Sequence, residues 1–197
     1  MVIIGGNIMI HVKTGPMFSS KSASLIERYN NIWNKEKVMC FKPKVDDRDL
    51  GIIKSRTSDT KIEAICIQDL DEIYEHIDEK IRTIFIDEIQ FLTGDVSVLL
   101  NLSINHDIDF YVSGLNMTSE QKPFGIMPQV LAVADEIEIL PASCFDCNKD
   151  AAYSYYEAGD KSGTILVGSD GYIPLCASCL RKRNSNYTKL TYKNKRK

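Results

Sequence analysis

No apolar segment of this chain approaches the ~20 residues that a membrane-spanning helix requires. The first residues, MVIIGGNIMIHV, have no basic segment ahead of the apolar one and no clear cleavage site, so they do not resemble a signal peptide. No internal repeat or low-complexity tract precedes the basic C-terminal end. These absences argue against a membrane-spanning or secreted protein, and we expect a protein of the reducing cytoplasm.

Charge is unevenly distributed along the 197 residues. The last 17 residues contain eight of the 24 lysines and arginines and no acid, which leaves residues 1–180 with 16 basic against 27 acidic side chains and a net charge of −11. A body this acidic is a poor general binder of nucleic acid. We therefore interpret residues 183–197 as a solvated, disordered basic tail, with contact to polyanions as the alternative.

The six cysteines fall into two classes. Cys40 and Cys66 stand alone in apolar stretches, which predicts buried, unreactive thiols. The other four form two C-x-x-C pairs with 28 residues between them: Cys144, Cys147, Cys176 and Cys179. Four thiolates complete a tetrahedral site with no open position, so we predict one structural zinc ion. A redox pair is the alternative, although a single C-x-x-C would suffice for it.

Short β-branched runs alternate with helical patterns before the first cysteine pair. We expect strands at residues 7–12, 38–41, 83–86, 108–112 and 136–140. We expect helices at residues 21–33, with Trp33 on the apolar face, at 95–105 and at 127–134, and apolar residues repeat at helical spacing through 70–81. Strands separated by helices indicate βαβ units and an α/β fold whose parallel sheet is covered on both faces.

The residue composition of the chain changes after Pro141. Cysteines, glycines and short tyrosine-rich segments replace the alternating pattern. We therefore predict a nucleotide-binding α/β domain at residues 1–141 and a metal-binding domain at 142–182, which is too small to bury a core without its metal.

A candidate phosphate-binding loop lies between the first strand and the first helix. It consists of Gly15, Pro16, Met17, Phe18, Ser19, Ser20, Lys21 and Ser22. It follows the pattern G-x-x-x-x-G-K-[ST], except that Ser20 replaces the second glycine. In such loops the backbone N–H groups and the lysine bind phosphate oxygens, and the hydroxyl after the lysine binds Mg²⁺. The alternative is a helix that merely begins with Ser-Lys-Ser.

An acidic pair, Asp87 and Glu88, ends the apolar strand predicted at residues 83–86. In folds with a phosphate-binding loop, an acid at this point holds Mg²⁺ from the strand beside the loop, and a second acid lies within reach of a nucleophile. The pair could also be an ordinary polar strand end. The loop at Lys21 favours the magnesium interpretation.

These segments, in this order, resemble the type II, zinc-containing thymidine kinases over roughly residues 8–182. The resemblance rests on G-P-M-F-S-x-K-S from Gly15, D-x-R from Asp46, D-E-x-Q-F from Asp87, G-L-N from Gly114, K-P-F-G from Lys122, and the cysteine pairs with Tyr172 before Cys176. It implies a P-loop NTPase-like parallel sheet flanked by helices, with a small zinc ribbon that carries a lasso loop.

The resemblance also implies a mechanism and a set of site residues. ATP with Mg²⁺ would bind residues 15–22, with Asp87 orienting the metal, Glu88 as general base toward the nucleoside 5′-hydroxyl and Arg48 near the transferred phosphoryl group. The nucleoside pocket would be formed by Met17, Phe91, Leu115, Phe124, Ile165 and Tyr172. Family members are commonly homotetramers, so we expect a homotetrameric kinase of pyrimidine salvage.

Four positions depart from the family pattern. Ser20 replaces a glycine, Ser119 replaces the usual phenylalanine, Val167 replaces a lasso glycine, and Tyr156 lies where arginine is common. We expect a kinase whose activity these departures can lower. One alternative is a degenerate paralogue that binds a nucleotide or a partner without turnover, and another is a nucleic-acid-binding zinc ribbon on an NTPase-like body.

Overall fold

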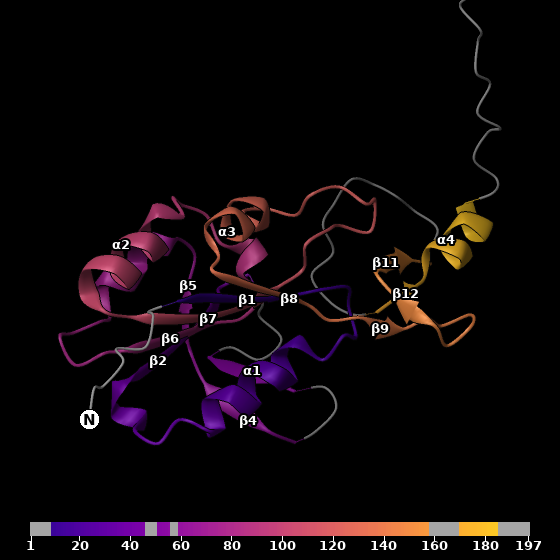
Figure 1. Ribbon diagram of the computed structural model, residues 1–197. Helices are drawn as coiled ribbons and strands as arrows, with labels where there is room; N and C mark the ends of the chain where they lie inside the picture. Colours follow the sequence, from indigo (N-terminus) through magenta and orange to yellow (C-terminus); the bar gives the residue numbers. More distant parts are fainter. Residues whose placement is uncertain (1–8, 46–50, 56–58, 158–169, 185–197) are drawn as a thin grey trace, which may run out of the picture.

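The computed structural model describes residues 9–45, 51–55, 59–157 and 170–184. Its centre is a six-stranded sheet in the order β5-β2-β6-β7-β1-β8, in which every neighbouring pair is parallel (Figure 1). The strands are β1 (Ile10–Thr14), β2 (Val38–Pro43), β5 (Ile65–Ile67), β6 (Thr83–Ile86), β7 (Asp109–Gly114) and β8 (Glu136–Ile139). The predicted α/β class is confirmed.

Helices cover both faces of the sheet, as its alternating sequence pattern requires. On one face, α2 (Ser97–His106), α3 (Met127–Val133) and a 3-10 helix at Leu70–Glu75 pack on the largest buried apolar cluster, which includes the fully buried Phe41 and Phe110. On the other face, α1 (Lys21–Asn30) and the hairpin β3 (Ile52–Lys54) and β4 (Lys61–Glu63) enclose a second cluster around Phe85. Figure 1 shows these two layers above and below the strands.

The predicted first helix is too long at its C-terminal end. It ends at Asn30 rather than continuing to residue 33, and Trp33 is 99% exposed instead of packing on the apolar face. Asparagine side chains compete with backbone hydrogen bonds in helices, and Asn34 instead accepts from the backbone N–H of Glu36 to begin a 3-10 turn. The periodicity of the apolar residues therefore continued past the end of the helix itself.

The helical spacing in residues 70–81 predicted the burial of Leu70, Ile73 and Ile81 correctly, but Tyr74 is exposed and the helix was overestimated. Leu70 and Ile73 are fully buried, yet the helix is a 3-10 segment that stops at Glu75. Asp69 and Glu72 fix its start through a capping box. The Asp69 side chain accepts a hydrogen bond from the backbone N–H of Glu72, and the Glu72 side chain accepts one from the backbone N–H of Asp69. The short strands β3, β4 and β5 were not predicted, because runs of three residues carry almost no period-two signal.

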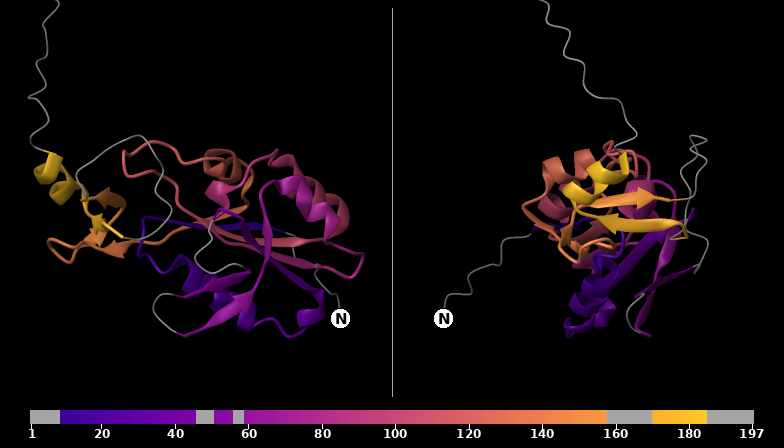
Figure 2. Two further views of the ribbon diagram at one scale, coloured as in Figure 1. Left: turned by 180° about the vertical axis from the view of Figure 1, so that it is seen from behind. Right: turned by 90° about the vertical axis from the view of Figure 1, so that its right-hand side faces the viewer.

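The C-terminal part forms a separate small body at the end of the sheet where β1 ends (Figure 2). It contains β9 (Ala142–Ser143), β10 (Asp150–Ala151), β11 (Tyr153–Tyr156), β12 (Tyr172–Leu175) and α4 (Ala177–Arg183). Its buried cluster is small, with two of the four paired cysteines, Cys144 and Cys179, among its members. Arg183 on α4 forms a two-bond ion pair with Asp146 and a further bond with Glu157.

Among the described residues, no helix combines the length and the apolar character that crossing a membrane would need.

Because Trp33 is exposed and Phe85 is buried, we expect their replacement to have very different effects on the free energy of unfolding. We expect Trp33→Ala to change the free energy of unfolding by no more than about 0.5 kcal/mol, because the indole is almost fully exposed. Phe85→Ala should cost about 3–5 kcal/mol, because it empties the space between α1 and the sheet. Chemical denaturation of the two variants beside the unsubstituted chain measures both values. A large loss with Trp33→Ala would mean that this side chain is covered in solution.

Candidate functional site

The loop at residues 15–22 joins the end of β1 to the start of α1, as predicted. Its backbone turns through three positive φ angles, 148° at Gly15, 65° at Phe18 and 59° at Ser20. A Cβ at Gly15 would lie 2.1 Å from the carbonyl oxygen of Leu140, so only glycine fits there. The loop is therefore pressed against the chain just before Pro141, where the sheet leads into the C-terminal body.

The N-terminus of α1 opens onto this loop. Ser20 is the N-cap, and its side chain makes no capping hydrogen bond. The first backbone N–H groups of a helix have no partner within the helix, and together with the helix dipole they favour an anion. The loop and the helix start thus form a place where a phosphate group could bind.

Lys21 is only 8% exposed and lies over the loop. Its Nζ donates to the carbonyl oxygen of Pro16 at 2.7 Å, to that of Gly15 at 3.3 Å and to Ser19 Oγ at 3.2 Å. A buried ammonium group needs such acceptors, and here they hold its charge at the centre of the loop.

Asp87, at the end of β6, is buried beside the same loop. Its carboxylate accepts hydrogen bonds from Ser113 on β7 and from Ser22, and Lys21 lies close enough to attract it. Burial and the charge of Glu88 raise the pKa of Asp87 to about 6, and these hydroxyls and the ammonium group partly oppose that shift. Hydroxyl and carboxylate oxygens are the ligands that Mg²⁺ prefers.

The strand that carries Asp87 is not the one beside the loop, and this part of the prediction is wrong. β7 lies between β1 and β6, and Ser113 from β7 fills the gap by donating to Asp87. The sequence analysis missed Ser113, which immediately precedes the G-L-N motif and could have been found from that position.

Glu88 follows with a φ of 54°, an unusual conformation for a residue other than glycine and one that recurs at functional sites. Its backbone N–H donates to Asp87 Oδ1 at 3.0 Å. Its carboxylate accepts a hydrogen bond from Gln90 Nε2 at 2.6 Å. The two acids are thus held in distinct orientations, with Asp87 toward the loop and Glu88 toward Gln90.

The structure gives separate contacts for the predicted pocket residues that it describes. Phe91 and Phe124 meet edge to face, with ring centroids 5.2 Å apart. Met17 is tied to the C-terminal body, because its backbone N–H donates to Ser154 Oγ at 2.9 Å. The remaining two predicted members, Leu115 and Tyr172, are each half-buried.

Two of the departures from the family pattern meet at Tyr172. Ser119 hydrogen-bonds its phenol group, and the ring of Tyr156 lies 4.9 Å from its ring. Burial raises the pKa of Tyr172, so the phenol stays neutral. Arg48, Ile165 and Val167 lie outside the described residues.

The four paired cysteines converge as predicted. Their Sγ atoms all lie within 4.8 Å of one another, and those of Cys147 and Cys176 are 3.7 Å apart. Four sulfurs at about 2.3 Å from a tetrahedral zinc ion would be separated by about 3.8 Å. The cluster therefore has the donor set and nearly the spacing to hold such a metal ion.

The thiol groups of the cluster differ in acidity, because backbone N–H groups favour ionisation of some and burial opposes it in others. Burial opposes ionisation of Cys144, but backbone N–H groups, including that of Cys176 at 3.3 Å, lower its pKa to about 6. Burial and the neighbouring sulfurs raise the pKa of Cys179 to about 12. A bound dication would relieve this crowding of sulfurs. Cys40, in contrast, is buried away from the cluster, and burial raises its pKa to about 12, as expected for an unreactive thiol.

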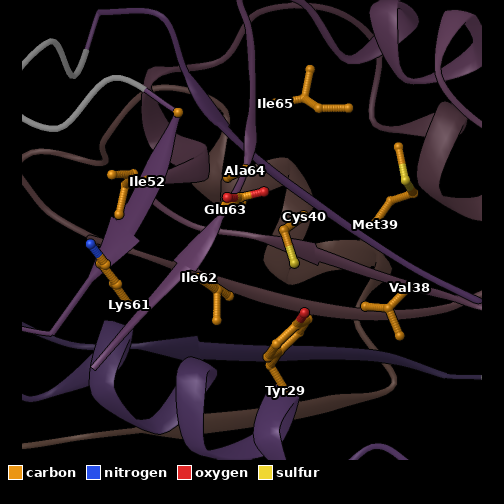
Figure 3. Close-up of a pocket in the computed structure, with 11 residues that line it drawn as sticks. Tyr29, Val38, Met39, Cys40, Ile52, Lys61, Ile62, Glu63, Ala64 and Ile65 are labelled. Carbon is orange, nitrogen blue, oxygen red and sulfur yellow. The ribbon is translucent and has the colours of Figure 1, made fainter. Parts of the chain in front are cut away.

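A separate hollow of about 690 Å³ lies on the α1 face, where β2 passes the β3–β4 hairpin. Figure 3 shows Tyr29, Cys40, Ile62 and Glu63 among the side chains around it. None of the predicted site residues that the structure describes lines this hollow.

Two comparisons with known proteins agree with the family resemblance that the sequence motifs indicate. The model of the thymidine kinase family matches residues 8–180. A thymidine kinase from Mycoplasma mobile is 34% identical over 173 residues, which cover 87% of this chain and 86% of that protein. The match spans both the sheet and the cysteine cluster.

The cysteine cluster predicts one tightly held metal ion per chain. Cys176→Ser should release that ion and loosen the buried cluster around Leu175, while the core of the sheet stays folded. Metal analysis of the purified protein and amide hydrogen exchange measure the two effects. Cys66→Ser is the matched control, because this cysteine lies outside the cluster, and it should keep the metal. Equal loss of protection in the sheet and in the cluster would contradict a local role for the metal.

Proposed function

This chain belongs to the thymidine kinase family, and we propose that it transfers the γ-phosphoryl group of ATP to the 5′-hydroxyl group of thymidine or deoxyuridine. The observation that carries the proposal is the meeting of Lys21 and Ser22, from the loop, with Asp87, from a strand two positions away in the sheet. A helix that merely began with Ser-Lys-Ser would have no reason to lie against a buried acid.

The loop would bind the triphosphate of ATP. Backbone N–H groups at the start of α1 would face the phosphate oxygens, and Lys21 would exchange its loop carbonyls for the β- and γ-oxygens. Ser22 and Asp87 would hold Mg²⁺, which neutralises the charge that develops on the phosphates. Mg²⁺ would favour the ionised form of Asp87 and would thus oppose the upward pKa shift that burial causes.

Glu88 would act as the general base. It would accept the proton of the 5′-hydroxyl group as that oxygen attacks the γ-phosphorus, while the bond from the γ-phosphorus to the β–γ bridging oxygen breaks and ADP leaves. Arg48 would stabilise the charge on the transferred phosphoryl group. The nucleoside would be enclosed by the residues named above, Met17, Phe91, Leu115, Phe124, Ile165 and Tyr172.

The metal of the cysteine cluster would be zinc, with a structural role, because four protein ligands leave no coordination position for substrate. We also propose three regions: a nucleotide-binding domain at residues 1–141, a zinc-binding domain at 142–182 and a basic tail at 183–197, whose first residue, Arg183, is still part of α4 and bonds Asp146. Family resemblance supports a homotetramer in cytoplasmic pyrimidine salvage. A paralogue without turnover gains no support, since the chain retains Lys21, Ser22, Asp87 and Glu88, the four residues to which the proposal assigns the chemistry.

Replacing the base tests the mechanism. Glu88→Gln keeps the size of the side chain and removes its basicity, so kcat should fall by about 10²–10⁴-fold while the KM for ATP changes little. A radiolabelled ATP assay with thymidine measures both. Glu136→Gln is the control, because Glu136 is an exposed residue on β8 and should leave kcat unchanged. An unchanged kcat for Glu88→Gln would show that another group takes the proton.

Replacing Ser20 tests the loop. Its left-handed φ of 59° costs a residue with a Cβ about 1–2 kcal/mol, and its Cβ crowds a backbone that must approach phosphate. Ser20→Gly should therefore lower the KM for ATP several-fold and leave the KM for thymidine unchanged. Asp107→Gly relieves a similar φ of 60° at the end of α2, and it should not affect the KM for ATP. If Ser20→Gly does not improve ATP use, the serine is not what limits the loop.

A further inference from the structure

We propose that Gln90 is a positioning residue, which uses the two ends of one side-chain amide to fix the general base relative to the nucleoside pocket. This proposal rests on the proposed function, since it assigns Gln90 a part in the same phosphoryl transfer. Gln90 is the fourth residue of the D-E-x-Q-F segment, and no role described above involves it.

The amide joins two separate segments of the chain. Gln90 Nε2 donates to Glu88 Oε2 at 2.6 Å, and Gln90 Oε1 accepts from the backbone N–H of Leu115 at 2.9 Å. The Leu115 N–H can only donate and the ionised Glu88 carboxylate can only accept. The amide therefore has one orientation that satisfies both partners, with its N–H toward the base and its oxygen toward the pocket.

The side chain is held tightly in this position. Gln90 is 2% exposed, so a lost partner could not be replaced readily by water. A Cβ on Gly114 would lie 2.4 Å from Gln90 Oε1, and a Cβ on Gly125 would lie 1.8 Å from the Gln90 carbonyl oxygen. The glycines of the G-L-N and K-P-F-G motifs thus leave the space that Gln90 occupies, and this gives both motifs a physical reason.

The segment around Gln90 also carries aromatic pocket residues. Phe91 follows it directly and packs edge to face on Phe124, which precedes Gly125. Leu115 begins the loop that leads through Ser119 to Phe124. Any displacement of that loop would pull on the Gln90 oxygen and, through the same rigid amide, on the Glu88 carboxylate. Correct seating of a nucleoside would therefore help to place the base.

Two substitutions distinguish the effects of the two hydrogen bonds that the Gln90 amide forms. Gln90→Glu keeps an oxygen for the Leu115 N–H but turns the donor toward Glu88 into a second acceptor. Gln90→Met has a similar length and loses both hydrogen bonds. We expect Gln90→Glu to lower kcat by about 10–100-fold with the KM for thymidine within about threefold of the unsubstituted value. Gln90→Met should lower kcat and also raise the KM for thymidine by about fivefold or more.

Gly114→Ala provides an independent test without changing Gln90. Its Cβ should displace the amide, so kcat should fall as it does with Gln90→Met. In a Gln90→Ala background the contact with the amide is removed, and of the three nearest contacts only those with Met127 Cε at 2.6 Å and Ile89 Cγ2 at 3.2 Å remain, so the same Gly114→Ala change should then cost less. This non-additivity in kcat is the signature of a shared contact. Gln129→Glu, at an exposed position on α3, is the matched control and should leave both kinetic constants unchanged.

The outcomes are distinguishable from failure of the proposed function. If the unsubstituted chain does not phosphorylate thymidine, the proposed function itself is wrong. If it does, and Gln90→Glu and Gly114→Ala both keep the unsubstituted kcat, Gln90 does not position the base. Equal effects of Gln90→Glu and Gln90→Met on kcat and KM, with a matching fall in thermal stability, would show a merely structural role and also overturn the proposal.

Discussion

The candidate site depends on one buried carboxylate. Asp87 is 6% exposed and lies where the end of β6, the hydroxyl group of Ser113 on β7 and the loop after β1 meet. A carboxylate at this depth is unfavourable unless donors and a cation surround it. Those donors come from two further strand ends, so the acid is stable only when the sheet has its observed order. The hydrogen-bond donors and the cation that stabilise this carboxylate thus link the sheet to the phosphate-binding loop.

A second constraint links the loop to the cysteine cluster. Gly15 allows the loop to touch the Leu140 carbonyl oxygen, and the Met17 N–H bonds Ser154 on β11. In the same small body, Arg183 joins α4 to Asp146 between the first two cysteines. The proposed zinc ion and the proposed ATP loop are therefore parts of one continuous set of contacts. Metal binding would order the wall of the pocket as well as the C-terminal chain.

The departures from the family pattern form contacts of their own. Ser119 and Tyr156 both reach Tyr172, one by a hydrogen bond and the other by ring contact. Two of the four departures are thus joined through one tyrosine. Ser20 is different, because its cost lies in the backbone angle and its own side chain makes no capping hydrogen bond in return.

Local patterns in the sequence predicted much of this protein. The spacing of the cysteines is a property of two tight turns, and the strand 83–86 and the helix start at Lys21 follow from runs of adjacent residues. The end of α1, the exposure of Trp33 and the strands β3 to β5 were not predicted, because competing asparagines and three-residue strands leave only weak local signals.

The order of the strands needed the tertiary structure. β7 comes to lie between β1 and β6 because long-range packing, and not any local pattern, selects the neighbours in a parallel sheet. That order alone brings Ser113 to Asp87 and places Gln90 between Glu88 and Leu115. The sequence thus determined which chemical groups are present, and the fold decided which of them touch.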